Sequence, residues 1–385
     1  MPSRTEFLPG GGRWRGRPGC TGLLLALPLA VALGVVVAAV AVRAGCGVPP
    51  GVAALRAAEG VREHGGQVEG ASADERPEDS TYLTFPEWFI VYSAQEYAGW
   101  VQAHPGSAFP YFRSVAQYWC GYHSVYQATR GRYPFNSGDH LMLVVIGTSY
   151  SAEYAVKGAY EHTAGWLTEL IGGDQTEEDR FGRQVAQDYG AFLEHTPWYD
   201  FPFGSKLAAL WGETGWWGAN PLRKWERKLA LSAEYGTKAL YGWAIGRATE
   251  TVYSAADEES LAVTESVPPA VLAQERRIQV VRQVDARTQL VRVPRYVAFR
   301  DVALLLARNG VRLLSVSGND RIMVTALAPR DWRFTLPEGT ALFEQEVLTE
   351  PGMKRVALGL PVPALSGTLV ALERQGVRIE HIYDY

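Results

Sequence analysis

One loop in the middle of the chain gathers the side chains best suited to acid–base chemistry. Glu194, His195 and Asp200 lie within the run Glu-His-Thr-Pro-Trp-Tyr-Asp-Phe-Pro-Phe, residues 194–203. A histidine acts as a general base near neutral pH when a carboxylate orients it, so His195 with Asp200 or Glu194 is the candidate catalytic group. No nucleophile or cofactor motif accompanies this loop. The alternative interpretation is a structural loop, whose aromatic side chains fill the core of the domain and whose prolines fix the path of the backbone.

Two further sets of charged residues recur with one spacing. Ser-Ala-Glu-Tyr at 151–154 and again at 232–235 is followed by a lysine four residues after the glutamate and a tyrosine three residues later. Residues four and seven apart lie along one stripe of a helix. One interpretation is a pair of surface ion pairs, worth a few tenths of a kcal/mol each. The other is a duplicated helical unit with a ligand site around a pseudo-twofold axis, formed by Glu153, Lys157, Tyr160, Glu234, Lys238 and Tyr241.

Metal and nucleophile motifs are missing from the sequence. The predicted helical part contains His123, His140, His162 and His195, but no H-E-x-x-H or cysteine-pair zinc motif occurs. There is also no G-x-S-x-G elbow, and no phosphate-binding glycine loop follows a strand. We therefore expect no metal and no cofactor, and whether the protein is an enzyme stays open.

The three cysteines make no disulfide framework. Cys20 and Cys46 flank a hydrophobic segment and would lie at its opposite ends, too far apart to pair. Cys120 stands between a tryptophan and a glycine on a predicted helix, so we expect an inert core thiol.

A third cluster combines tryptophan with cations and suits a membrane surface. Leu222, Trp225 and Leu229 share one predicted helix face, and such a mixture favours the headgroup region of a bilayer. The expected membrane-interface residues are Trp216, Trp217, Arg223, Lys224, Trp225, Arg227 and Lys228. The alternative is an amphipathic core helix with a solvated basic face.

The hydrophobic segment itself spans residues 21–42 without a charge. About 20 residues of helix cross a bilayer, and a helix satisfies its own backbone there. The arginines before it place the N-terminus in the cytoplasm and the rest of the chain outside. A cleaved or lipoprotein signal is the alternative, although the run is long for a signal peptide and Arg43 fits a lipoprotein box before Cys46 poorly.

Changes in composition and stretches rich in Gly, Pro and acidic residues divide the chain into domains and linkers. The net charge of −4 argues against a general nucleic-acid binder, and 47% hydrophobic residues favour globular folding. We expect a basic cytoplasmic tail (1–20), the span (21–42), an acidic Gly/Ala linker (43–80), an aromatic-rich helical domain (81–253), a second linker (254–275) and a small α+β domain (276–385).

The last 110 residues contain another repeat. Arg-Asn-Gly-Val-Arg at 308–312 and Arg-Gln-Gly-Val-Arg at 374–378 both end an apolar helix at glycine and begin a strand. Two such βαβ halves predict a ferredoxin-like α+β sandwich with extra strands in its middle.

Together these features predict a single-pass envelope protein that presents two extracytoplasmic domains to protein partners or to the membrane surface. One alternative is a binding module for an apolar ligand such as a lipid, quinone or haem, because aromatic residues of the helical domain could line a pocket. The other alternative is an enzyme that uses His195 and Asp200.

Overall fold

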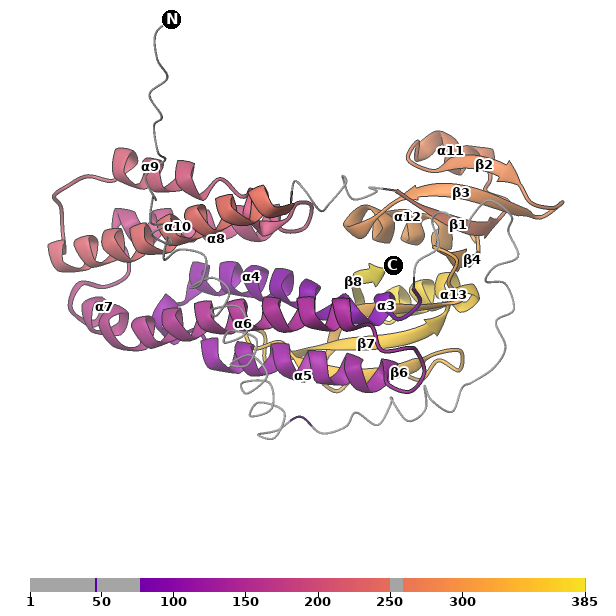
Figure 1. Ribbon diagram of the computed structural model, residues 1–385, viewed down its shortest axis with the longest axis horizontal. Helices are drawn as coiled ribbons and strands as arrows, with labels where there is room; N and C mark the ends of the chain where they lie inside the picture. Colours follow the sequence, from indigo (N-terminus) through magenta and orange to yellow (C-terminus); the bar gives the residue numbers. More distant parts are fainter. Residues whose placement is uncertain (1–45, 47–76, 250–258, 385) are drawn as a thin grey trace, which may run out of the picture.

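The computed structural model describes Cys46 and residues 77–249 and 259–384. In these ranges the fold is α+β, with a helical region followed by two four-stranded antiparallel sheets (Figure 1). The predicted span at 21–42 and nearly all of the 43–80 linker lie outside the described residues. Within the described part, no helix is long and apolar enough to cross a membrane.

The helices begin at the signals that the sequence carries. The Asn136 side chain accepts a hydrogen bond from the Asp139 backbone, and Thr176 forms a capping box with Asp179. The helical elements are α3 (Ser80–Leu83), α4 (Phe85–Ala103), η2 (Gly106–Ala108), α5 (Tyr111–Thr129), α6 (Ser137–Tyr160), the π-helical turn η3 (Glu161–Gly165), α7 (Trp166–Gly172), α8 (Glu177–Phe192), η4 (Trp198–Asp200), α9 (Phe203–Glu213) and α10 (Pro221–Thr249).

The helical region contains two copies of one three-helix unit. The order α4, η2, α5, α6 recurs as α8, η4, α9, α10. Ala-Gln-Glu-Tyr at 94–97 matches Ala-Gln-Asp-Tyr at 186–189, and Phe-Pro-Tyr at 109–111 matches Phe-Pro-Phe at 201–203, both 92 residues on. The third helices match at the shorter offset of 81 largely because α9 has 11 residues and α5 has 19.

Side-chain contacts repeat with the sequence. Trp119 Nε1 donates to Ser151 Oγ at 2.9 Å, and Trp211 Nε1 donates to Ser232 Oγ at the same distance. The duplicated unit thus keeps the same tie between its second and third helices.

The C-terminal region is also duplicated. Its elements are β1 (Glu259–Glu265), α11 (Pro269–Gln274), β2 (Gln279–Gln283), β3 (Thr288–Pro294), α12 (Tyr296–Arg308), β4 (Leu313–Val316), β5 (Arg321–Pro329), β6 (Thr340–Glu346), β7 (Met353–Pro361), α13 (Val362–Arg374) and β8 (Arg378–Tyr383). The strand orders β2-β3-β1-β4 and β6-β7-β5-β8 are the same topology twice.

This pairing differs from the single ferredoxin-like sandwich expected from the sequence. Each copy has three antiparallel strands before its helix and one after it, so each copy forms its own sheet. Residues 259–274, which the sequence analysis placed in a linker, form β1 and α11. The expected junctions are present: Gly310 and Gly376 have φ of +73° and +74°, and each ends a helix just before a strand.

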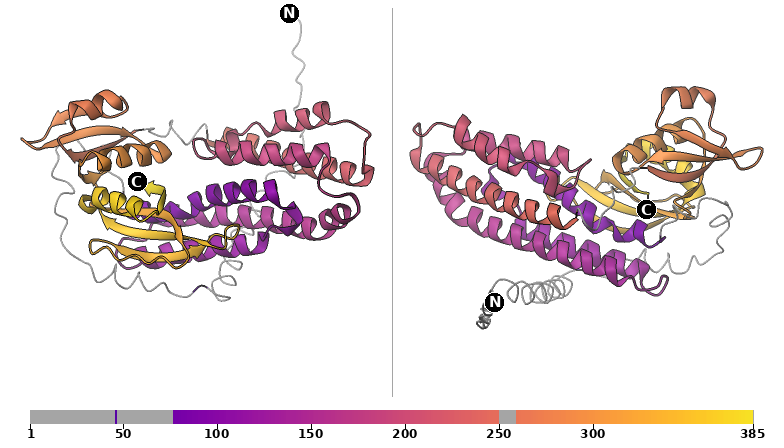
Figure 2. Two further views of the ribbon diagram at one scale, coloured as in Figure 1. Left: turned by 180° about the vertical axis from the view of Figure 1, so that it is seen from behind. Right: turned by 45° about the horizontal axis from the view of Figure 1, so that its top comes forward.

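Two shared cores hold these parts together. Helices α12 and α13 lie between the two sheets and bury apolar side chains from both (Figures 1 and 2). Helices α3 to α5 cover the other face of the second sheet with an aromatic core. Arg355 on β7 pairs there with Glu96 on α4 at 3.0 Å, and Thr81 Oγ1 donates to the Tyr383 carbonyl at 2.7 Å. The helical region and the second sheet therefore pack as one body.

A disulfide joins Cys46 to Cys120 on α5, with their Cα atoms 5.3 Å apart. The expectation that Cys120 is an inert core thiol is wrong. The sequence hides this pair because 74 residues separate the two cysteines and only folding brings them together.

Candidate functional site

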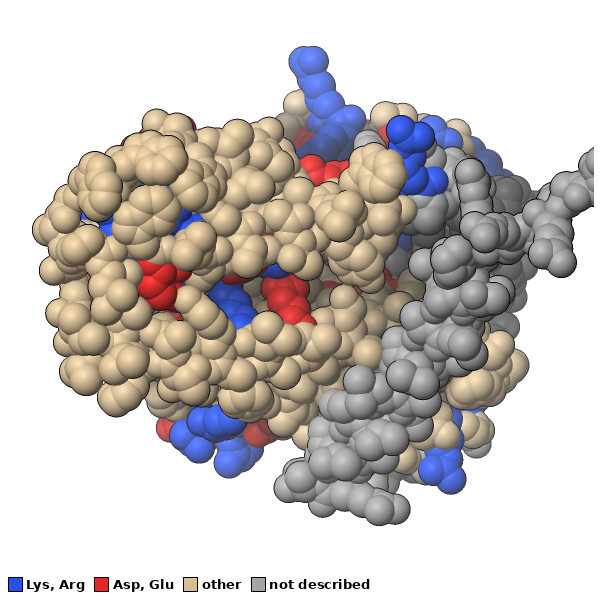
Figure 3. Space-filling model, turned by 60° about the vertical axis from the view of Figure 1, so that its left-hand side comes forward, with Lys and Arg blue, Asp and Glu red and all other residues tan. Residues whose placement is uncertain are grey.

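A pocket lies where the two copies of the helical unit face one another. Its walls come from α4 and α6 of the first copy and from α8 and α10 of the second. Figure 3 shows this hollow, with basic and acidic side chains visible inside it. An open, charged hollow between two related halves is the most developed candidate site in the described part of the chain.

Inside the pocket the two glutamate–lysine sets meet. Lys157 Nζ on α6 lies 3.1 Å from Glu234 Oε1 on α10, and Lys238 Nζ on α10 lies 2.8 Å from Glu153 Oε1 on α6. Lys238 also contacts Glu234, four residues earlier, at 3.0 Å. Each set thus pairs with the other across the pocket, as a pseudo-twofold arrangement requires.

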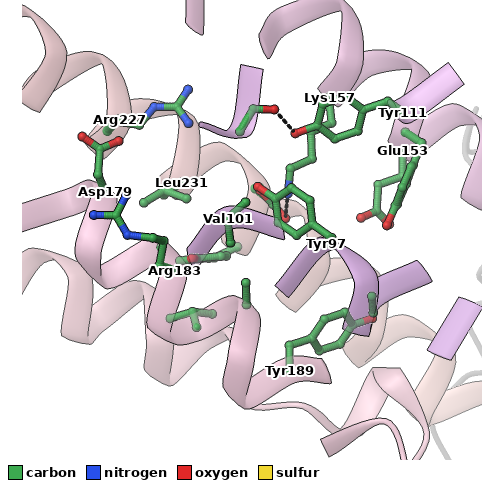
Figure 4. A pocket seen from close by; sticks show the side chains of 18 of the residues that line it. Tyr97, Val101, Tyr111, Glu153, Lys157, Asp179, Arg183, Tyr189, Arg227 and Leu231 are labelled. Atoms are coloured by element: carbon green, nitrogen blue, oxygen red, sulfur yellow. Dashed lines mark hydrogen bonds and ion pairs between the residues drawn. The ribbon is translucent and has the colours of Figure 1, made fainter. Parts of the chain in front are cut away.

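Aromatic rings hold both lysines in equivalent ways. Lys157 Nζ lies 4.2 Å from the centre of the Tyr97 ring, and Lys238 Nζ lies 5.2 Å from that of Tyr189, the matching tyrosine of the second copy. A cation over an aromatic face is attracted by the negative face of the ring. Figure 4 shows Tyr97, Tyr111, Glu153 and Lys157 grouped at one side of the pocket.

Electrostatics keep Glu234, Lys157 and Lys238 ionised. Burial opposes ionisation of Glu234, but Lys157 and Lys238 outweigh it and lower its pKa to about 2. Burial likewise disfavours the charge of both lysines, yet the facing glutamates raise the pKa of Lys157 and of Lys238. A carboxylate with so low a pKa is a weak base and a protonated lysine is no nucleophile, so these groups act as fixed charges.

The opposite side of the pocket holds Asp179, Arg183 and Arg227 (Figure 4). Arg227 pairs with Glu161 of the π-helical turn at 2.8 Å and with Glu226 at 2.6 Å. Arg183 lies 3.8 Å from Asp174. A π-helical turn often marks a functional site, because its extra residue re-aims a side chain.

The charges that line the pocket balance. Acids and bases are equal in number, five of each: Glu153, Asp174, Glu178, Asp179 and Glu234 against Lys157, Arg183, Arg223, Arg227 and Lys238. The residues that line the pocket therefore carry no net formal charge.

The structure does not assemble the expected catalytic loop. His195 is exposed at the end of α8, and its nearest acid is the adjacent Glu194, at 3.8 Å. Glu194 accepts a hydrogen bond from Gln95 at 2.6 Å, and Asp200 is exposed in η4. The aromatics of this loop behave as the alternative interpretation predicted, because Phe201 and Phe203 are buried in a small core with Tyr235.

The cations of the expected membrane-interface cluster point inward. Arg223, Lys224, Arg227 and Lys228 are buried, and each pairs with a carboxylate, for example Arg223 with Asp179 at 2.9 Å and Lys224 with Glu178 at 2.9 Å. A cation engaged in this way cannot meet a lipid headgroup. Trp225 is half-buried, whereas Trp216 and Trp217 are exposed, at 58% and 82% of their surface.

Tyr160 and Tyr241, the last residues of the two repeated sets, do not line the pocket. Tyr160 donates to Glu226, and Tyr241 makes a tilted ring contact with Trp198, with ring centres 5.3 Å apart. In their place the pocket uses Tyr97, Tyr189 and the tyrosines of the two Ser-Ala-Glu-Tyr runs, Tyr154 and Tyr235. The 92-residue offset between the two copies is the signal that would have identified Tyr97 and Tyr189.

Among the described residues, no group of three or more His, Cys, Asp or Glu side chains is arranged to hold a metal ion. Comparisons with protein-family models, with curated proteins and with solved structures found no match for this chain.

Proposed function

We propose that this chain is a membrane-anchored binding protein whose helical region holds a small polar ligand between its two repeats. The observation that carries the proposal is the reciprocal pairing of Glu153 with Lys238 and of Glu234 with Lys157 inside an open pocket. Three of these four side chains are at most 22% exposed, and buried ion pairs seldom add stability over apolar residues. Their place at the centre of a helical domain therefore favours a role in recognition.

The balance of charges favours a net-neutral ligand, and a zwitterion fits best. A lone anion would compete with the glutamates for both lysines and leave negative charge in excess. A ligand with one cationic and one anionic group exchanges partners with the Glu–Lys pairs and keeps the site neutral. Ten charged lining residues disfavour the alternative of a wholly apolar ligand such as a quinone or haem, since desolvating them without compensation is costly.

The membrane anchor and the outward orientation remain part of the proposal. They rest on the uncharged run at 21–42 and on the arginines before it. The Cys46–Cys120 disulfide supports an extracytoplasmic position, because disulfides persist in oxidising compartments.

Thermal unfolding of the full chain in detergent tests the ligand class. The panel contains a zwitterion (phosphocholine or glycine betaine), a matched anion (phosphate) and a matched cation (choline). A ligand at about 100 times its Kd stabilises the folded state by about 2.7 kcal/mol.

We expect a zwitterion to raise the Tm more than either single ion does, and Glu234→Gln to abolish this rise. Glu194→Gln, outside the pocket, is the matched control and should keep it. A rise that survives in Glu234→Gln, or no rise with any zwitterion tested, would contradict the proposal.

A further inference from the structure

Up to residue 246, helix α10 has its charges on the inside and its large apolar residues on the outside. Arg247 in its last turn is exposed and lies 5.8 Å from the centre of the Trp243 ring. The side chains of its seven charged residues between 221 and 246 are at most 22% exposed, and all seven form ion pairs. Its exposed large side chains in the same stretch are instead Leu222, Leu229, Leu240, Tyr241 and Trp243, with Leu240 at 69%. This is the reverse of an ordinary surface helix, which turns its polar face to water.

The equivalent helix of the first copy continues the pattern. Along α6 and α7 the exposed large side chains are Leu141, Val156, Trp166, Leu167, Leu170 and Ile171. Helix α7 packs beside α10, since Gly172 lies against Arg223. Figure 3 shows the surface around the mouth of the pocket without charged side chains over a wide area. Patches of this kind mark contact with another apolar surface.

We infer that the outer faces of α6, α7 and α10 together form a bilayer-docking surface, which lies in the headgroup and upper acyl region without crossing the membrane. Exposed Trp166, Trp216, Trp217 and Trp243 suit that region, because indole combines an apolar ring with one N–H donor.

The disulfide brings this surface within reach of a membrane. Cys46 follows the predicted span by four residues, and an extended chain advances at most about 3.6 Å per residue. Cys46 therefore lies within about 14 Å of the end of that span, and Cys120, whose Cα is 5.3 Å from that of Cys46, lies within about 20 Å of it. Helix α5, which carries Cys120, packs on α6 through Tyr118, whose hydroxyl donates to the Leu143 carbonyl at 2.7 Å.

This surface differs from a basic membrane-binding helix, because five of the six cations of α10 form ion pairs inside the protein and only Arg247 is exposed beside Trp243. Docking should therefore depend little on salt and should not require anionic lipid.

Photo-crosslinking of the full chain in phosphatidylcholine vesicles tests the inference. A photoreactive benzoyl-phenylalanine replaces Leu170 or Leu240 in separate variants. The matched control places it at Gln187, exposed on α8, whose outer face is polar. All variants keep the anchor, so the control measures mere proximity to the membrane.

We expect lipid adducts from the probes at positions 170 and 240 and no lipid adduct from the probe at 187. The adduct yields at 170 and 240 should be the same in low and high salt and with added phosphatidylglycerol. Leu170→Glu combined with Leu240→Glu should abolish the adduct from a probe at Val156, with an unchanged melting curve as evidence of folding. Equal lipid adducts at all three positions, a steep fall with salt, no lipid adduct, or an adduct with a second copy of the chain would overturn the inference.

Discussion

Replacing Glu234 by glutamine should destabilise the protein more than the same change at Glu153, although the two residues are equivalent in the repeat. Glu234 contacts two lysines and its side chain is 22% exposed, whereas Glu153 contacts one and is 42% exposed. The pKa of Glu234 falls from 4.5 to about 2 on folding, which corresponds to about 3 kcal/mol of stabilisation at neutral pH. An exposed ion pair contributes about 0–1 kcal/mol, which is the expectation for Glu153.

The pH dependence has a defined sign. Because the folded-state pKa lies below the unfolded value, this stabilisation is complete above pH 4.5 and disappears as the pH falls toward 2. Urea unfolding followed by tryptophan fluorescence should show Glu234→Gln about 3 kcal/mol less stable than the wild type at pH 7. The difference should vanish near pH 2. A loss of the same size for Glu153→Gln, or a difference that does not change with pH, would refute this account of the cluster.

A fourfold replacement separates stability from recognition. Glu153→Leu, Glu234→Leu, Lys157→Met and Lys238→Met remove the whole cluster and leave no charge unpaired. Replacing a complete buried ion network by apolar residues of similar size is often neutral or stabilising. We expect near wild-type stability together with loss of ligand binding. A stable variant that still binds the ligand would show that the cluster is not the site.

Three further predictions concern other parts of the chain. Burial and the nearby Asp139 raise the pKa of Glu87 to about 7, so its ionised form is costly above pH 7. Glu87→Gln should therefore stabilise the protein by up to about 3 kcal/mol at pH 9 and leave it unchanged at pH 4, as measured by urea unfolding. Cys46→Ser should cost at most about 4.5 kcal/mol, from the entropy of a loop closed over 74 residues, whereas Cys20→Ser should leave the Tm unchanged. Gly147→Ala should lower the free energy of unfolding by about 1–3 kcal/mol, because the new Cβ would lie 2.2 Å from the Tyr118 ring. Gly99→Ala has open space around it and should raise the free energy of unfolding by about 0.5–1 kcal/mol. Thermal melts of the two variants check both expectations.

Local signals made the helices and the glutamate–lysine sets predictable. Capping by Asn136 and Thr176 marks helix starts within a few residues, and an identical Ser-Ala-Glu-Tyr run is visible at any offset. The rest of the repeat is harder to see, because Tyr111 matches Phe203 and Trp100 matches Phe192. In each of these pairs an aromatic side chain is kept, but the two residues are not identical, so a search for identical residues misses them.

Strand pairing and the disulfide depend on contacts far apart in the chain. The strand β1 begins at a run of acidic residues that is typical of a linker. The sequence of β1 also does not indicate that it pairs with β3. The burial of Arg223 and Arg227 was missed for a related reason. A basic helix face looks solvated until the acids of α8 and of the π-helical turn are placed against it.

The fusion of two copies into one chain has a consequence for how a ligand sits. A pocket made by two identical subunits would accept an asymmetric molecule equally well in either of two orientations. Here the two halves differ: Phe203 stands in the second copy where the first has Tyr111, and the two glutamates differ in burial. Tyr111 has a hydroxyl that Phe203 lacks, and the Glu234 carboxylate is more buried than that of Glu153. The two possible orientations of an asymmetric ligand therefore differ in binding free energy. The differences between the two copies thus give the site a direction that a pocket between two identical subunits would not have.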